Sequence, residues 1–268
     1  MNKNITIKKI IIFTICIASI ICIVFLVRNV IFDVNRKSFG SVKLVTEYDE
    51  NTTIDEMKTV TFGLYPQSDI TGNIKEPIEW IVLDRQGGRT FLLSKYILDC
   101  KSYDNSGENT TWETCSLRSW LNIDFYFQAF SDSEQNKIQM TNVINNNNID
   151  YDINGGNNTN DKIFCLSIEE IRKYFGNGTK KKYGYQLGKN VATRGTNFAK
   201  NVDNYGYKLW VSDSSDEWYF GNSYFWLRSP GYIQLRAADV CDVGYLRTNG
   251  IDIGSPGIGV RPALWISE

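Results

Sequence analysis

Aromatic rings and carboxylates alternate between residues 205 and 220, and they are the strongest indication of ligand chemistry in the chain. The rings are Tyr205, Tyr207, Trp210, Trp218, Tyr219 and Phe220, and the acids are Asp213, Asp216 and Glu217. Aromatic faces stack on sugar rings, and carboxylates accept hydrogen bonds from hydroxyl groups. The segment therefore predicts a carbohydrate-binding site made by Trp210, Asp213, Asp216, Trp218 and Tyr219. The alternative is that most of these rings pack into the hydrophobic core.

Catalysis is disfavoured by the composition. The 268 residues include no histidine, which removes Ser-His-Asp and Cys-His catalytic groups and every histidine-ligated metal site. The adjacent acids Glu169 and Glu170 do not form a glycosidase pair, because neighbours on a helix point about 100° apart. We therefore predict no catalytic residue, no metal ligand and no cofactor.

Calcium is the metal for which clustered oxygen ligands in the sequence offer an alternative. Its oxygen ligands would be Asp239, Asp242, Asn249 and Asp252. Their spacing is not that of an EF-hand, and aspartate and asparagine are common in turns for backbone reasons. The preferred interpretation is that these residues form turns.

Arg228 and Arg261 each lie inside an apolar stretch that predicts a strand. A guanidinium in this setting either recognises an anionic ligand or forms a buried ion pair. Because a charged group in a core requires a partner, we predict structural ion pairs with Glu79, Asp99 or Asp239.

The cysteines predict one disulfide. Cys16 and Cys22 lie in an apolar N-terminal segment, where they act as small apolar residues. The other four are Cys100, Cys115, Cys165 and Cys241. An even number in an oxidising compartment permits disulfides, and Cys100 and Cys115 bracket a short loop that makes them the best pair. Cys165 stands in an apolar run that favours a buried thiol.

An apolar segment without charge runs from Ile10 to Val27. As a helix it spans roughly 27 Å, close to the hydrocarbon thickness of a bilayer. We predict an uncleaved signal anchor over residues 10–32 that contacts the lipid bilayer. The side chains at the C-terminal end of the segment are large, whereas a signal-peptide cleavage site has small residues. A cleaved signal peptide is the alternative.

The anchor sets the predicted domain organisation and localisation. Residues 1–9 form a basic cytoplasmic tail, residues 33–58 a polar stalk, and residues 59–268 one extracytoplasmic α+β domain. First helices with basic leaders usually keep the N-terminus inside, and long following domains translocate. The chain is therefore predicted to be a single-pass protein of the cell membrane.

The charge balance excludes nucleic acid as a partner. The chain has 29 basic and 30 acidic residues, and three of the lysines precede residue 28, where no acid occurs. The remainder is weakly acidic, whereas nucleic-acid binding requires a basic surface.

Hydrophobic periodicity predicts strands at both ends of the domain and helices between them. Strands are expected at residues 60–65, in a hairpin of 78–83 with 90–93, and at 224–227, 237–241 and 263–266. Short helices are expected after Ser116, Ser131 and Ser167, the last two with capping-box spacing to Glu134 and Glu170. An Asn-rich exposed loop is expected over 142–161. The order predicts an α+β fold with mainly antiparallel sheets and two to three short helices.

Several ordered motifs from Val60 to Ile266 carry a resemblance to a known family. They are Phe62-Gly63-Leu64-Tyr65-Pro66-Gln67, Pro77-Ile78-Glu79-Trp80, Trp112-Glu113-Thr114-Cys115-Ser116-Leu117-Arg118, Trp226-Leu227-Arg228-Ser229-Pro230-Gly231 and Gly259-Val260-Arg261-Pro262-Ala263-Leu264. The chain resembles the bacterial domain-of-unknown-function family numbered 6273, common in clostridia-like organisms. That resemblance implies no specific activity.

The C-terminal motifs are also similar to C-type-lectin-like folds. This resemblance implies that the first and last strands of the domain pair, and that residues 205–220 belong to a loop region that carries ligands. The Glu-Pro-Asn and Gln-Pro-Asp signatures of calcium-dependent sugar binding are absent from the sequence. One lectin-like branch, the formylglycine-generating oxidases, holds copper with two cysteines, and Cys241 is similar to one of them without a matching partner.

The predicted function is non-catalytic binding of an envelope glycan or a surface protein by a membrane-anchored domain. A structural or accessory subunit of an envelope complex is the first alternative. An oxidase or hydrolase of unknown type is the second.

Overall fold

The computed structural model describes residue 22 and residues 41–202, 207–213, 215 and 219–268. The chain divides into two compact units, Met1–Val42 and Lys43–Glu268. In the described part of the chain, no helix combines the length and apolar character that a bilayer crossing requires. Apart from Cys22, which is helical, the predicted anchor over residues 10–32 lies outside the described residues.

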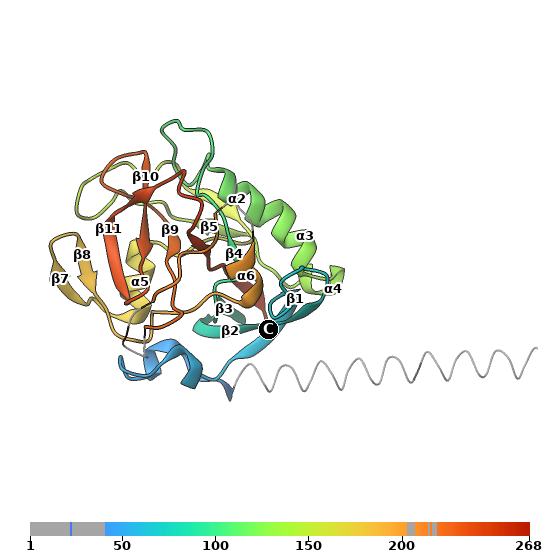
Figure 1. The fold of residues 1–268 in the computed structure, drawn as a ribbon. Helices are drawn as coiled ribbons and strands as arrows, with labels where there is room; N and C mark the ends of the chain where they lie inside the picture. Colours follow the sequence, from blue (N-terminus) through green and yellow to red (C-terminus); the bar gives the residue numbers. More distant parts are fainter. Residues whose placement is uncertain (1–21, 23–40, 203–206, 214, 216–218) are drawn as a thin grey trace, which may run out of the picture. The chain divides into compact units, whose positions relative to one another are not determined.

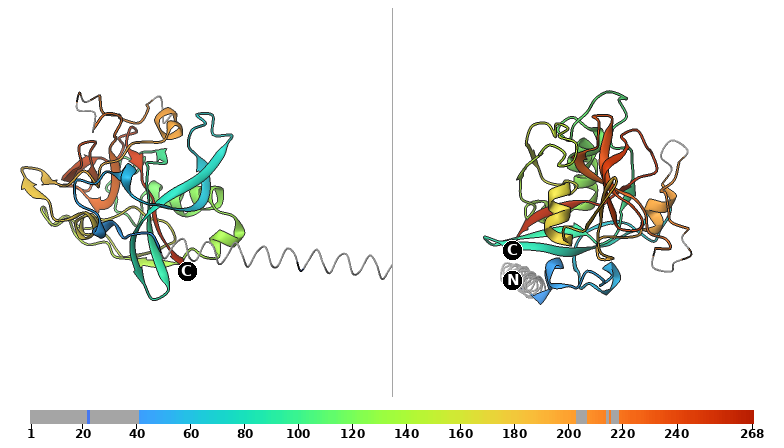
Figure 2. Two further views of the ribbon diagram at one scale, coloured as in Figure 1. Left: turned by 90° about the horizontal axis from the view of Figure 1, so that it is seen from below. Right: turned by 90° about the vertical axis from the view of Figure 1, so that its left-hand side faces the viewer.

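The second unit is an α+β domain whose strands are mostly antiparallel (Figure 1). One sheet has the order β1-β2-β3-β13, with β1 Val60–Pro66, β2 Lys75–Gln86, β3 Arg89–Ser94 and β13 Ala263–Ser267. The predicted hairpin is confirmed as β2–β3, and Figure 2 shows it along one side of the domain with β13 beside it. The expectation that the first and last strands pair is wrong. The β2–β3 hairpin lies between the two strands, because β1 pairs with the outer edge of β2 and β13 pairs with the outer edge of β3.

A second sheet carries most of the remaining strands. Its order is β4-β12-β9-β10-β11-β8-β7, with β4 Asp99–Cys100, β12 Gly259–Val260, β9 Phe225–Pro230, β10 Arg236–Val240, β11 Tyr245–Asp252, β8 Gly184–Gln186 and β7 Thr179–Lys181. The contact between β12 and β9 is parallel, and the other pairings in this sheet are antiparallel. The strands β5 (Thr141–Val143) and β6 (Thr159–Asp161) form a separate ribbon.

Short helices lie between strands of the second sheet and the β5–β6 ribbon in chain order. They are α2 Ser116–Trp120, α3 Tyr126–Ala129, α4 Asp132–Gln135, α5 Ile168–Phe175 and α6 Asn197–Asn201, with a π-helical turn at Leu121–Phe125 between α2 and α3. Both predicted capping boxes are present, because Ser131 caps α4 and Ser167 caps α5. Gly176, at φ 93°, ends α5.

Three tryptophans lie fully buried in the core, and each indole N–H has an acceptor. Trp80 donates to the Phe62 carbonyl at 2.7 Å, and Trp226 donates to the Lys101 carbonyl at the same distance. Trp112 donates to the Asp161 carboxylate at 2.9 Å. Buried rings with satisfied N–H groups explain much of the aromatic content without a ligand.

Residues 43–58 belong to the domain and do not form a stalk. They contain two 3-10 turns, η1 Val45–Glu47 and η2 Ile54–Glu56. Val45, Ile54 and Met57 are buried. The compact unit therefore begins at Lys43, because this segment carries its own apolar anchors for the core.

The loop over residues 142–161 is held by a ribbon at its base and by one buried amide. The β5–β6 pair closes it, and the Asn148 Nδ2 atom donates to the carbonyl oxygens of Pro230 (2.7 Å), Gly231 (3.2 Å) and Thr248 (2.8 Å). The Asn-rich composition predicts a loop, but it does not indicate that one of the asparagines is a core residue.

Candidate functional site

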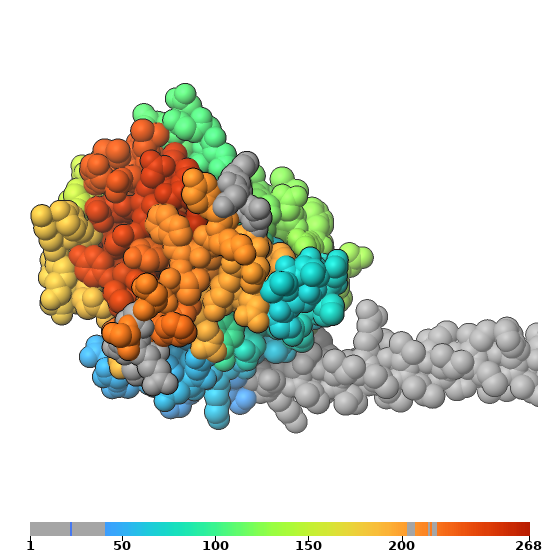
Figure 3. Space-filling model, in the orientation of Figure 1, coloured from blue at the N-terminus to red at the C-terminus, as the bar shows by residue number. Residues whose placement is uncertain are grey.

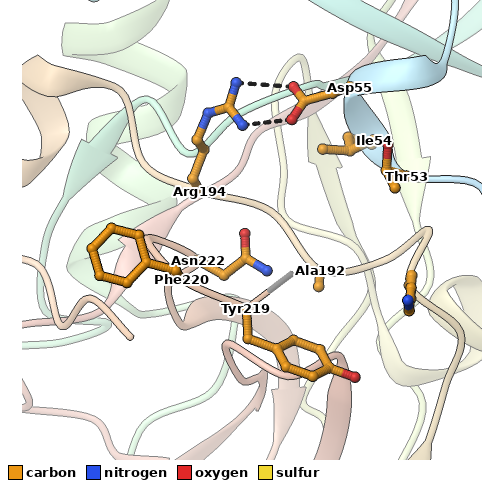
Figure 4. Close-up of a pocket in the computed structure, with 9 residues that line it drawn as sticks. Thr53, Ile54, Asp55, Ala192, Arg194, Tyr219, Phe220 and Asn222 are labelled. Atoms are coloured by element: carbon orange, nitrogen blue, oxygen red, sulfur yellow. Dashed lines mark hydrogen bonds and ion pairs between the residues drawn. The ribbon is translucent and has the colours of Figure 1, made fainter. Parts of the chain in front are cut away.

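A pocket of about 270 Å³ opens between η2, the loop that precedes α6 and the turn before β9. We call it the Asp55–Arg194 pocket. It is lined by Thr53, Ile54, Asp55, Lys189, Ala192, Arg194, Tyr219, Phe220 and Asn222 (Figure 4). These residues come from three segments that are far apart in the sequence. In Figure 3 the orange surface of the later segments meets the blue surface of the segment that begins the domain.

A planar polar pair forms one wall of this pocket. The Arg194 guanidinium binds the Asp55 carboxylate through both oxygens, at 2.5 Å and 3.0 Å, and the Tyr96 hydroxyl donates to Asp55 at 2.7 Å. The guanidinium also lies 4.9 Å from the centre of the Tyr96 ring. Because both charged side chains are nearly half exposed, the ion pair contributes only about 0–1 kcal/mol to stability. Its larger effect is to fix two planar groups at the pocket wall.

The pair keeps Asp55 ionised. Partial burial would raise the pKa of Asp55, but the hydrogen bonds from Tyr96 and Arg194 and the Arg194 charge hold that pKa below its ordinary value. At neutral pH this carboxylate is a hydrogen-bond acceptor and does not carry a proton for general acid chemistry.

Backbone contacts hold both members of the pair in place. Thr53 caps η2 and makes a reciprocal hydrogen bond with Glu56, which orients Asp55 in the first turn. On the other side, the Ile97 N–H donates to the Arg194 carbonyl at 3.1 Å, and Arg194 pairs with Asn222 in an isolated β-bridge. Backbone hydrogen bonds of the domain therefore fix the positions of both side chains at the pocket wall.

A tight turn presents two rings and an amide to the pocket. Gly221 has φ 82°, and the Asn222 N–H donates to the Tyr219 carbonyl at 3.0 Å. Phe220 is 68% exposed, which is unusual for a phenylalanine side chain. The Asn222 amide lies between the Asp55–Arg194 pair and the Tyr219 ring (Figure 4).

A second pocket of about 550 Å³ adjoins the first at Lys189 and Tyr219. We call it the β7–β8 pocket, because the hairpin of these two strands forms part of its wall. Its lining is Glu50, Asn51, Phe175, Gly176, Asn177, Gly178, Thr179, Gln186, Leu187, Gly188, Lys189 and Tyr219. Most of these residues are polar or glycine.

The predicted carbohydrate residues are only partly brought together. Tyr219 lines both pockets, whereas Trp210 and Asp213 line neither of them. Trp210 is 44% exposed, and it packs edge-on against Tyr224 with ring centres 6.0 Å apart. Asp216 and Trp218 lie outside the described residues.

Of the nine residues that line this pocket, Tyr219 alone was in the predicted set, and the other eight include Asp55, Arg194, Phe220 and Asn222. Asp55 stands in a segment that reads as a polar stalk, and it contacts Arg194 across 139 positions. The Thr53–Glu56 capping spacing is a local signal that this segment folds. Nothing local in the sequence pairs Asp55 with Arg194.

Arg228 lies in β9, whereas Arg261 lies between β12 and β13 and not inside a strand as predicted. Both have structural contacts, but their partners differ from those predicted. Arg228 binds Glu170 at 2.5 Å and also donates to the carbonyl oxygens of Cys165 and Ile144. Arg261 forms no ion pair with a carboxylate of the described chain. It donates to backbone carbonyls of Ser94, Val191 and Lys95, and its guanidinium lies 5.0 Å from the centre of the Phe225 ring. Burial lowers the pKa of Arg261 to about 9, which leaves it charged at neutral pH.

The disulfide predicted between Cys100 and Cys115 is not formed. Both are free, buried thiols with separate backbone partners. The Cys100 thiol donates to the Pro256 carbonyl at 3.1 Å, whereas the Cys115 sulfur caps α2 by accepting from the Arg118 N–H at 3.4 Å. Cys165 is also a buried free thiol, as predicted.

The acids considered for calcium have other partners. Asp239 is fully buried and accepts from Arg247 at 2.8 Å, and Asp252 accepts from the Gly254 N–H at 2.9 Å. Burial raises the pKa of Asp239 to about 7, and the attraction of Arg247 offsets only part of this shift. Asp239 therefore takes up a proton more readily in the folded state than in the unfolded state.

This shift gives a pH-dependent prediction for Asp239→Asn. The contribution of Asp239 to stability falls as pH rises from its unfolded value near 3.8 to about 7, because the folded state binds the proton more tightly. The destabilisation caused by Asp239→Asn is therefore expected to be largest near pH 4 and to shrink toward pH 7. Urea unfolding of both proteins across this range measures the difference, and a cost that stays constant or grows with pH contradicts the prediction.

Comparison with known proteins gives one match. A family model described as "Domain of unknown function (DUF6273)" matches residues 87–268. No curated protein and no solved structure matches the chain. The matched range starts at the β2–β3 turn, so it includes Arg194, Tyr219 and Asn222 but not Asp55.

Proposed function

Because this chain belongs to the DUF6273 family, a domain of unknown function, we propose its role from the site itself: the domain binds a glycan of the bacterial cell envelope and does not alter it chemically. Residues 10–32 would anchor it in the cell membrane with residues 43–268 on the outer side. A C-type-lectin-like core is the proposed fold type, and the place of Tyr219 in the pocket supports it, since the lectin resemblance expects ligands in that loop region.

The observation that carries this proposal is the exposed Phe220 ring beside fixed planar polar groups. The amide of Asn222 and the Asp55–Arg194 pair supply donors and acceptors that match the hydroxyl groups of a sugar. Phe220 and Tyr219 supply ring faces for the apolar side of the sugar. Because Asp55 is ionised and held by hydrogen bonds from Tyr96 and Arg194, it suits binding of a ligand better than proton transfer to one.

The test compares two exposed phenylalanines. Phe220→Ala in the full chain, kept in detergent, is expected to weaken binding of a glycan found on an array by about tenfold, since a stacking surface is lost. Phe127→Ala is the matched control, because Phe127 on α3 is similarly exposed at 66% and does not line the pocket. Isothermal titration calorimetry measures both affinities. If Phe220→Ala binds the glycan as tightly as the unmodified protein does, the Asp55–Arg194 pocket is not the glycan-binding site.

Trp210→Ala separates this pocket from the site predicted by the sequence alone. Trp210 packs on Tyr224 and does not line either pocket, so its loss is expected to change glycan affinity by less than twofold. A large loss would move the glycan site toward Trp210.

An accessory role in an envelope complex is the second candidate, and one surface favours it. Leu64, Ile70 and Ile74 of β1 and the β1–β2 loop are exposed, as are Ile123 and Phe127 near α3. The Lys75 ammonium donates to the Gln128 carbonyl at 2.6 Å, which joins the base of this loop to α3. Exposed apolar side chains on neighbouring elements are typical of protein contacts. Loss of a stoichiometric co-purifying protein in Phe127→Ala, but not in Phe220→Ala, would support this role.

A further inference from the structure

We infer that the Asp55–Arg194 pocket and the β7–β8 pocket form one groove that takes an uncharged oligosaccharide of at least two sugar units. The inference rests on the proposed glycan function and specifies the ligand. It starts from the shared lining, because Lys189 and Tyr219 belong to both pockets. A ligand seated against Tyr219 in one pocket therefore lies directly beside the other.

The ridge between the pockets is held by the backbone. The carbonyl of Glu50 accepts from the N–H groups of Lys189 (2.8 Å) and Asn190 (3.3 Å). A Cβ atom on Gly188 would come within 2.4 Å of that same carbonyl oxygen, so glycine is required for this close approach. The position of Lys189 relative to the η2 side of the groove is therefore fixed before a ligand arrives.

The β7–β8 pocket is shaped by a similar close approach. A Cβ atom on Gly178 would lie 2.5 Å from the Gln186 carbonyl oxygen, and Gly178 has φ 64°. This glycine lets the chain after α5 turn directly onto β8 and leaves the pocket open beside it. The β7–β8 pocket has a volume of about 550 Å³, which falls in the range of small-molecule sites, and the Asp55–Arg194 pocket, at about 270 Å³, lies just below that range. Each pocket can therefore act as a subsite.

The charges that line the groove balance. Glu50 and Asp55 are its acids, and Lys189 and Arg194 are its bases. Asp55 and Arg194 neutralise each other directly. An anionic polymer needs an excess of positive charge to offset its own field, and this lining has none. Asparagine, threonine and glutamine side chains supply the remaining polar contacts, which suit hydroxyl and amide groups.

The test is a length series with a blocked second subsite. The probes are β-1,4-linked glucose and N-acetylglucosamine oligomers of one to six units, with galacturonic acid oligomers as the anionic comparison. For the full chain, affinity for a neutral series is expected to rise at least tenfold from one unit to three or four and then level off. Asn177→Trp places a bulky ring at the β7–β8 pocket and is expected to abolish this gain without changing the affinity for the single sugar. Asn146→Trp, at an exposed asparagine that lines neither pocket, is the matched control and keeps the gain.

The outcomes separate this inference from the proposed function. Neutral sugars that bind equally well at every length overturn the extended groove and leave the glycan function standing. A preference for galacturonic acid oligomers overturns the uncharged ligand. Absence of binding to every neutral and anionic probe, together with a negative glycan array, overturns the proposed function and this inference with it.

Discussion

Asn148→Asp is expected to lower the free energy of unfolding by about 3–5 kcal/mol. The Nδ2 atom of Asn148 donates to three carbonyl oxygens, of Pro230, Gly231 and Thr248, and the residue is almost fully buried. Aspartate has nearly the same shape but turns the donor into an acceptor that faces those oxygens. The introduced carboxylate would be buried without a cation and would repel all three carbonyls.

Asn148→Ala and an exposed asparagine provide the comparison. Alanine removes the hydrogen bonds without adding a charge, so its expected cost is smaller, about 2–3 kcal/mol. Asn146 lies in the same loop and is exposed, so Asn146→Asp is expected to change stability by less than about 0.5 kcal/mol. Urea unfolding measures all three variants. The cost of Asn148→Asp should also shrink in acid, where the introduced group is protonated. A cost no larger than that of alanine would contradict the assigned role.

Asp161→Ala is expected to destabilise the domain by about 3–5 kcal/mol. The carboxylate is buried and accepts from Arg118 (2.6 Å), Trp112 (2.9 Å) and Thr159 (2.7 Å). It therefore joins the start of α2 to β6. Removing it leaves a guanidinium, an indole N–H and a hydroxyl without their acceptor.

A double-mutant cycle with Arg118 isolates the ionic part of this contact. Because Arg118 is partly exposed, Arg118→Ala alone is expected to cost less than Asp161→Ala. The double variant should be less destabilised than the sum of the two single variants by about 1–2 kcal/mol. Additive costs in urea unfolding would show that the two side chains do not stabilise each other.

Elements that depend on neighbouring residues could be predicted from the sequence. The β2–β3 hairpin follows from two alternating stretches around Gly87 and Gly88, and both short capped helices follow from Ser–Glu spacing of three residues. In each case the residues that make the element lie within one turn or one hairpin of each other. Periodicity and caps carry this information because they act over that range.

Contacts between distant segments could not be predicted in the same way. For Arg228 the sequence offered Glu79, Asp99 and Asp239, but these acids contact Lys95, Tyr65 and Arg247 respectively. The partner of Arg228 is Glu170, which also accepts from the N–H of the α5 cap residue, Ser167. Which acid meets which arginine depends on how the sheets pack, and composition does not determine that packing. For the same reason, the Asp55–Arg194 pocket could not be predicted from the sequence.

The four buried thiols of the domain can be used to measure its local unfolding by chemical labelling. Burial raises the pKa of Cys241 to about 11 and those of Cys100 and Cys115 to about 12, and it also raises the pKa of Cys165. Thiolates are the form that alkylating reagents attack, so labelling of these positions has to wait for a fluctuation that exposes them. The labelling rate of each cysteine would then report how often the structure around it opens. Four separate positions in the native protein could be compared in this way.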